Sequence, residues 1–127
     1  MNYFLAKTEA EEFSIDDLMN NGPSPWTGVN NPQAKSFLRS MKNGDFVFIY
    51  HTGNVRAIVG LAKVTSVGEI PTFTFVKKYK TPIATLSEIK SHPEFSDLKL
   101  VRQSRLSVMD VPPKLLSFLN KKEASLN

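Results

Sequence analysis

The residues best suited to hold a flat ligand lie between Pro25 and His51. Trp26, the only tryptophan, stands in a stretch rich in proline and glycine, and the amides of Asn30 and Gln33 follow it. His51, one of two histidines, ends an apolar run. An indole stacks on flat rings, amides offer both donor and acceptor, and a neutral imidazole pairs with a polar edge. These residue types predict a pocket for an aromatic ring.

Several candidate residues also have a purely structural interpretation, and the sequence leaves both interpretations open. Trp26 can belong to the core, since tryptophan is highly buried on average. Asn31 precedes Pro32 and is better explained as a helix cap than as a ligand contact. His51 follows a buried strand and can be a satisfied structural histidine. Arg105 is either a solvated side chain or a clamp for phosphate.

The elements that must position these residues can be read from periodicity and caps. Strands are expected over 3–7, 46–50, 57–64, 72–79 and 106–109, and helices after Ser14, Asn31, Thr85 and Pro112. Gly60 interrupts a buried strand and indicates a bulge or a close backbone approach. Several consecutive strands favour an α+β fold with a curved or barrel-like sheet over a doubly wound parallel sheet.

Length and composition limit the number of domains, the cofactors and the location that can be expected. With 127 residues, the chain is expected to form one domain, with 121–127 as a frayed polar tail. The absence of cysteine and the presence of only two histidines argue against a metal site, and no cofactor is expected. The start of the chain does not resemble a signal peptide, and no apolar run is long enough to span a membrane, so a cytoplasmic protein is expected.

The net positive charge comes from the second half of the chain. Residues 64–127 contain ten Lys or Arg and six Asp or Glu, which accounts for the whole net charge of +4. A basic half suits an anionic partner such as nucleic acid, although a solvated lysine-rich surface explains it equally well. The sequence contains no phosphate-binding glycine loop, paired-histidine motif or nucleophile elbow. We therefore expect a binding protein rather than an enzyme.

Several stretches, taken in order, resemble the EVE domain, a member of the PUA-like superfamily related to YTH domains. They are 3–9 (YFLAKTE), 14–18 (SIDDL), 26–34 (WTGVNNPQA), 41–45 (MKNGD), 48–51 (FIYH), 60–64 (GLAKV) and 100–108 (LVRQSRLSV). The chain departs from the family pattern at Ala10, Asn30 and Thr52, where the family usually has Pro, Arg and Ser. Its segment 65–74 is also shorter than the family's, which removes residues that could wall a pocket.

The resemblance implies a PUA-like mixed curved sheet or barrel with peripheral helices. It also implies a non-catalytic reader that takes a modified base, such as modified cytosine in DNA or a modified base in RNA, into an aromatic-lined pocket. In this interpretation Trp26 stacks on the base, while Asn30, Gln33, His51 and Thr8 contact its edge. The phosphates would meet a basic rim, which is formed by Arg105, Lys77 and Lys78.

Two other functions remain open at this stage. The same pocket could hold a free nucleobase or a metabolite, or it could belong to an enzyme that acts on a nucleobase or its glycosidic bond. Salt dependence separates the first alternative from a nucleic-acid reader, because phosphate contacts weaken with salt and a neutral ligand shows almost no slope. The choice between DNA and RNA, the modification and the oligomeric state all remain open.

Overall fold

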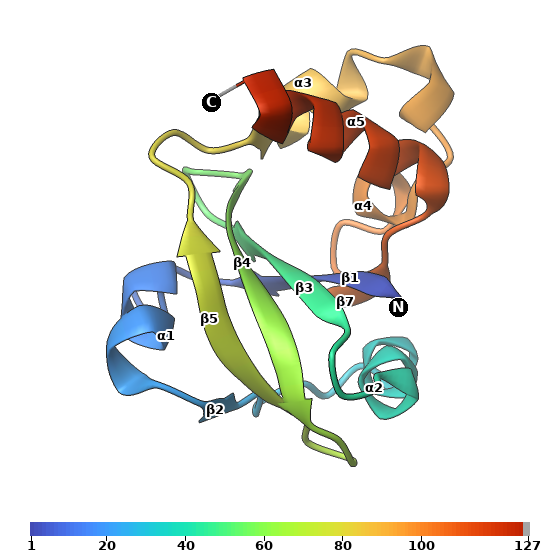
Figure 1. The fold of residues 1–127 in the computed structure, drawn as a ribbon. Helices are drawn as coiled ribbons and strands as arrows, with labels where there is room; N and C mark the ends of the chain where they lie inside the picture. Colours follow the sequence, from blue (N-terminus) through green and yellow to red (C-terminus); the bar gives the residue numbers. More distant parts are fainter. Residues whose placement is uncertain (126–127) are drawn as a thin grey trace.

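A computed structural model of the chain describes residues 1–125, which form one mixed sheet curled into a half-barrel with helices around it (Figure 1). The sheet has seven strands in the order β2-β5-β4-β3-β1-β7, and β6 pairs with β4. The strands are β1 (Tyr3–Thr8), β2 (Ser24–Pro25), β3 (Phe46–His51), β4 (Ala57–Ser66), β5 (Thr72–Lys78), β6 (Ala84–Thr85) and β7 (Val108–Asp110).

The centre of the sheet combines one parallel and two antiparallel pairings. β1 runs parallel to β3, which places Thr8 opposite His51, and β3 runs antiparallel to β4. β4 in turn pairs antiparallel with β5. The two apolar runs at 46–49 and 58–64 are therefore neighbouring strands of one curved sheet, as the sequence predicts. Their near-continuous hydrophobicity reflects burial on both faces.

Gly60 lies where the central strands are irregular. The register shifts between Ile49 and Tyr50 on the β3 side and between Leu61 and Ala62 on the β5 side. A Cβ at Gly60 would stand 2.5 Å from Cδ1 of Ile15 and 2.8 Å from the carbonyl oxygen of Lys77. Both expectations for this glycine, a bulge and a close approach, are confirmed.

The helices cover the edges and ends of the sheet (Figure 1). α1 (Ile15–Asn21) lies beside β5, and α2 (Pro32–Ser40) packs near β7. The remaining helical segments gather at the other end of the strands: α3 (Leu86–Lys90), the 3₁₀ turn η1 (Pro93–Phe95), α4 (Lys99–Arg102) and α5 (Pro113–Ser125). The Ser14–Asp17 capping box and the caps at Asn31 and Thr85 form as their sequence patterns predict.

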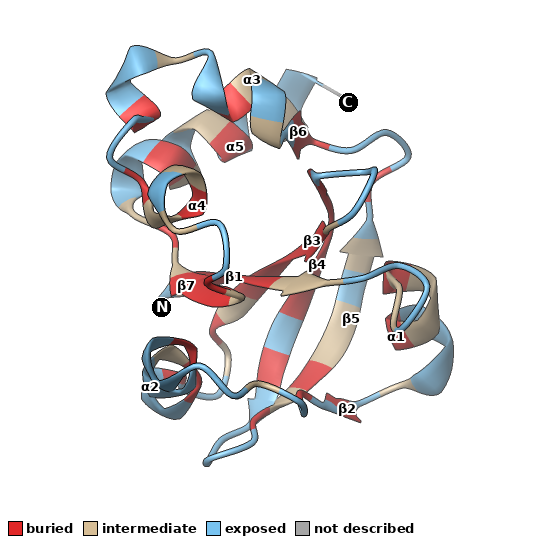
Figure 2. Cartoon of the chain, turned by 180° about the vertical axis from the view of Figure 1, so that it is seen from behind, coloured by how far each residue is buried: buried red, intermediate tan, exposed pale blue. Residues whose placement is uncertain are grey.

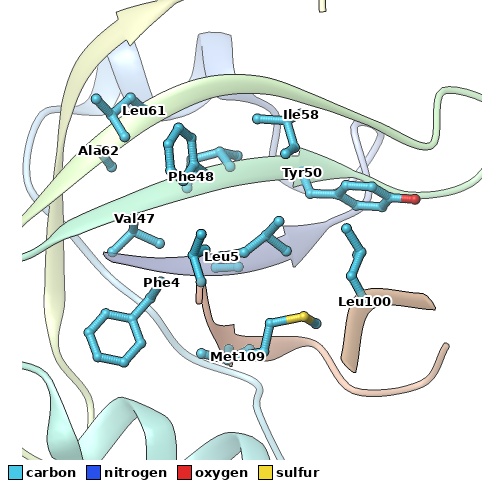
Figure 3. Packing of buried hydrophobic residues seen from close by; sticks show 14 of the residues in the cluster. Phe4, Leu5, Val47, Phe48, Tyr50, Ile58, Leu61, Ala62, Leu100 and Met109 are labelled. Carbon is cyan, nitrogen blue, oxygen red and sulfur yellow. The ribbon is translucent and has the colours of Figure 1, made fainter. Parts of the chain in front are cut away.

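The core lies between the curled sheet and these helices. Figure 2 shows β3 and the first part of β4, residues 57–62, almost continuously buried, whereas the end of β4 carries exposed residues. β5 is mostly half-buried or exposed and contributes the buried Phe73. Side chains of β1, β3, β4 and β7 pack together with Leu100 of α4 (Figure 3). No helix within residues 1–125 is both long and apolar enough to cross a membrane.

The end of the described chain is helical. α5 continues to Ser125, into the segment 121–127 that the sequence predicts to fray. Lys122 Nζ lies 2.6 Å from Oε2 of Glu88, and Glu123 Oε1 lies 3.0 Å from Nζ of Lys77. These ion pairs hold the last turns of α5 near α3 and β5. Residues 126–127 lie outside the described part of the chain.

Candidate functional site

A cavity of about 710 Å³ opens where the parallel strands β1 and β3 end. Four segments line it: the end of β1 with the turn that follows, β2 with the adjoining tryptophan loop, the residue after β3, and the loop before β7. The lining residues are Lys7, Thr8, Glu9, Glu12, Phe13, Ser24, Pro25, Trp26, Thr27, Gly28, Val29, Thr52, Ser104, Arg105 and Ser107.

Backbone hydrogen bonds join three of these segments and anchor the fourth to the turn before β5. Thr52 donates its N–H to the carbonyl oxygen of Thr8 at 3.0 Å, and Lys7 donates its N–H to Ser107 at 2.8 Å. On the other wall, Trp26 donates its N–H to the carbonyl oxygen of Pro71 at 2.9 Å. The cavity is thus built on strand ends and their direct continuations, which is a rigid way to present binding residues.

Trp26 forms part of the cavity wall and part of the core at once. Its ring stacks on Phe73 with centroids 5.0 Å apart, and Phe13 meets it edge to face at 5.9 Å. Only 7% of the residue is exposed. The indole therefore packs as a core residue and also presents a small, fixed apolar surface to the cavity; its stacking on a ligand stays a prediction.

Arg105 lines the cavity and is exposed, and it forms no ion pair with another residue of the described chain. Lys7 adds a second cation that the sequence analysis missed. Its Nζ donates to the carbonyl oxygen of Ser104 at 3.1 Å and lies 5.5 Å from the centroid of the Tyr50 ring. Burial lowers the pKa of the Lys7 ammonium. Glu9 and Glu12 are exposed on the same cavity, so its rim carries charges of both signs.

His51 does not line this cavity, although the sequence places it in the pocket. The residue is 7% exposed, and Nε2 of its imidazole accepts a hydrogen bond from the backbone N–H of Ile15 at 3.1 Å. Burial lowers the pKa of His51, Asp16 opposes that shift, and Lys78 adds to it. The structural interpretation of His51 is therefore the one that its contacts support.

The two predicted edge-reading amides are also outside the cavity. Asn30 and Gln33 are exposed and absent from its lining, although Gly28 and Val29 just before them belong to it. Asn31 Oδ1 accepts from the N–H of Ala34 at 3.0 Å and so caps α2. The segment 26–34 therefore has two functions in the fold. Residues 26–29 line the cavity, and the residues after them begin α2.

The predicted rim lysines of β5 are engaged elsewhere. Lys77 pairs with Glu123 at 3.0 Å, and Lys78 pairs with Asp16 at 2.9 Å. Neither lysine lines the cavity. The acidic partners of these two lysines are distant in sequence. The local pattern of a basic run at a strand end therefore could not predict that both lysines form ion pairs.

Thr8 does line the cavity, but its hydroxyl already has a use. It donates to the carbonyl oxygen of Phe13 at 2.8 Å and so holds the turn after β1. Of the eight predicted site residues, Thr8, Trp26 and Arg105 come together here. Within residues 1–125, no three His, Cys, Asp or Glu side chains are grouped so that they could hold a metal ion.

The half-barrel of mixed strands, the peripheral helices and the cavity at the ends of parallel strands define a PUA-like α+β domain. The model of the EVE domain family matches residues 2–73 and 68–121. The chain belongs to the EVE domain family, which confirms the resemblance drawn from its motifs.

Proteins similar to this chain include thymocyte nuclear protein 1 of two vertebrates. The Gallus gallus protein is 34% identical over 117 residues, covering 81% of this chain and 48% of that protein. The Rattus norvegicus protein is 35% identical over 118 residues, covering 82% and 51% respectively. The chain therefore spans about half the length of the curated relatives it matches.

Solved structures share the whole fold. A hypothetical protein from Leishmania major superposes with a TM-score of 0.89 at 30% identity, covering 100% of this chain and 98% of that one. The human THYN1 protein, solved in complex with DNA containing 5-methylcytosine, superposes with a TM-score of 0.86 at 25% identity. That match covers 97% of this chain and 98% of the human one.

Proposed function

We propose that this domain is a non-catalytic reader that binds DNA carrying a modified cytosine, with the base held in the cavity beside Trp26. The observation that carries the proposal is the likeness, over nearly the whole chain, to a human protein solved with DNA containing 5-methylcytosine. The cavity gives the proposal a location, since it lies at strand ends and combines an aromatic wall with cationic side chains.

The size and lining of the cavity suit a base turned out of its stack. Its volume of about 710 Å³ lies within the usual range for small-ligand sites. Trp26 and Phe13 supply apolar surface, against which the methyl group of 5-methylcytosine would lose contact with water. A base in this position would leave its phosphates at the rim, where Arg105 is exposed.

Arg105 and Lys7 are the cations placed to meet those phosphates. Arg105 lies on the loop before β7, and Lys7 binds that same loop through the carbonyl oxygen of Ser104. An arginine without an acidic partner is suited to a phosphate oxygen, because its planar group can donate two parallel hydrogen bonds. Phosphate contacts of this kind position a strand without reading its sequence.

The mixed charge of the rim supports a second candidate, a binding protein for a free nucleobase or nucleoside. Glu9 and Glu12 offset Lys7 and Arg105, so the charged residues of the cavity sum to zero in formal charge. A rim without net formal charge does not by itself favour an anionic strand over a neutral ligand. The two candidates differ in their dependence on salt.

A binding measurement tests both candidates. Short single-stranded and duplex DNA, and matching RNA, each with one 5-methylcytosine or with cytosine, are titrated with the protein at several salt concentrations. We expect tighter binding to the methylated DNA and a log affinity that falls linearly with log salt. Equal binding to modified and unmodified strands would contradict the reader function. Binding of free 5-methylcytidine with no salt slope would favour the second candidate.

A further inference from the structure

The residue that follows β3, Thr52, carries a hydroxyl with no hydrogen-bond partner. Thr52 lines the cavity and is half-buried, but its Oγ1 is shielded from solvent and has no partner among the described residues. Its backbone is fixed, because its N–H donates to the carbonyl oxygen of Thr8 at 3.0 Å. Buried hydroxyls in folded proteins are nearly always paired, so an exception on the wall of a cavity requires an explanation.

The other hydroxyls of the cavity show why Thr52 is different. Thr8 donates to the carbonyl oxygen of Phe13 at 2.8 Å, and the buried Ser24 donates to that of Gly22 at 2.9 Å. Thr27 and Ser104 are exposed, and the half-buried Ser107 does not have a shielded, unpaired hydroxyl, so water can reach these three residues. Thr52 is thus the lining residue within 1–125 whose hydroxyl has neither a protein partner nor access to bulk water.

We propose that Thr52 is a specificity-determining residue, whose hydroxyl donates a hydrogen bond to an acceptor on the edge of the bound base. This inference rests on the proposed function, and it names the group that the cytosine ring would meet: its carbonyl oxygen or its unprotonated ring nitrogen. Rotation about the Cα–Cβ bond moves the threonine hydroxyl among staggered positions, so a ligand against this wall can draw it out of its unpaired position.

The proposal predicts an unusual combination of effects on stability and affinity. In the free protein, replacing an unpaired buried hydroxyl with a methyl group of the same shape relieves a cost rather than removing a bond. In the complex, the same replacement removes a hydrogen bond to the ligand. A purely structural threonine would show the opposite pattern: its replacement would lower the melting temperature and leave the affinity for DNA unchanged.

The test uses Thr52→Val, Thr52→Ser and Thr85→Val, each measured for melting temperature and for affinity to two DNA probes. One probe is a short strand with a single 5-methylcytosine, and the other has an abasic site in its place. We expect T52V to melt no earlier than the wild type and to bind the methylated strand about tenfold more weakly. We expect T52S, which keeps the hydroxyl, to bind within about twofold of the wild type.

The abasic probe and T85V give the controls. T52V should bind the abasic strand like the wild type, since no base edge is present; an equal loss on both probes would move the contact to the backbone and overturn the proposal. T85V removes a hydroxyl that is already paired, because Thr85 Oγ1 accepts from the N–H of Glu88 at 3.0 Å, and Thr85 does not line the cavity. It should therefore melt earlier and keep its affinity. An equal affinity loss in T85V, or a lower melting temperature for T52V, would also overturn the assignment to Thr52.

The outcome separates this inference from the proposed function. If the wild-type protein does not prefer the methylated strand to its unmodified counterpart, the reader function fails, and the role of Thr52 fails with it. If the wild type shows that preference and T52V binds the methylated strand equally well, only the role of Thr52 is overturned.

Discussion

Nε2 of His51, at the end of β3, accepts a hydrogen bond from the backbone N–H of Ile15 at the start of α1, with the two nitrogens 3.1 Å apart. The acceptor nitrogen has to be unprotonated, so the bond uses the neutral imidazole. It satisfies one of the four N–H groups that the first turn of a helix leaves without intrahelical partners. The histidine that the sequence offered as a ligand contact thus joins a strand to a helix.

This bond predicts a pH dependence of stability. Burial, the largest cause, lowers the pKa of His51 below its ordinary value of 6.5, so the unfolded chain binds this proton more readily than the folded one. The stability that His51 contributes is therefore present above pH 6.5 and is lost as the pH falls from there through the folded pKa. Melting temperatures measured across this range should decline toward the acidic side.

Two variants isolate the contribution of His51. His51→Gln keeps an acceptor near the position of Nε2 but does not titrate, so its melting temperature should lose most of the decline in this range. His92→Gln removes the other histidine, which is partly exposed and lies 3.3 Å from Glu94, and should leave the decline in place. A decline of equal size in His51→Gln would contradict the assignment.

Gly60 supports a second prediction, on packing. A Gly60→Ala protein must place a methyl group 2.5 Å from Cδ1 of Ile15 and 2.8 Å from a backbone oxygen of β5. The side chain can shift but the strand backbone cannot do so cheaply, so we expect a loss of about 1–3 kcal/mol in the free energy of unfolding. Denaturant unfolding of this variant and the wild type measures it, and an unchanged midpoint would show that the bulge accommodates the methyl group.

The sequence predicted the parts of this fold that depend on local chemistry. The caps at Ser14 and Asn31 form because a side-chain oxygen needs only the N–H groups of the next turn. The pairing of β3 with β4 follows from two apolar runs joined by a short loop. Membership of the EVE family could also be predicted, because the motifs occur in order along nearly the whole chain.

The composition of the site could be predicted only in part, because it depends on pairings between distant residues. The parallel contact of β1 with β3 brings Thr8 beside His51 and Thr52, and no local pattern reveals which strands will be neighbours. The acidic partner of Lys78 lies 62 residues away in the chain. No sequence motif marks a single lysine such as Lys7 as a cavity-lining residue.

Trp26 supports a third prediction, which separates its two roles. Trp26→Ala removes the stack on Phe73 and the edge contact with Phe13, so the free energy of unfolding should fall by about 3–5 kcal/mol. Trp26→Phe keeps an aromatic ring against Phe73 and should destabilise less, while presenting a smaller surface to the base. We expect it to lose part of the roughly 1–3 kcal/mol that stacking on a base contributes.

The measurements for Trp26 are thermal midpoints and affinities for matched strands with 5-methylcytosine and cytosine. A Trp26→Phe protein that remains folded and keeps its full preference for the methylated strand would show that the indole supports the wall without contacting the base. Trp26→Ala alone cannot distinguish these roles, since an unfolded protein loses its ligand as well.

Arg105 supports the last prediction, which concerns nucleic acid as the class of ligand. Arg105→Ala removes an exposed cation at the cavity that has no acidic partner in the described chain, so it should weaken binding to methylated and unmodified strands alike. The slope of log affinity against log salt should fall by roughly one, the value for one phosphate contact. Arg102→Ala is the matched control, because Arg102 is exposed on α4 but does not line the cavity, and its slope should equal that of the wild type. A salt slope that is unchanged in Arg105→Ala, or lowered equally in both variants, would mean that the strand does not meet the protein through this rim.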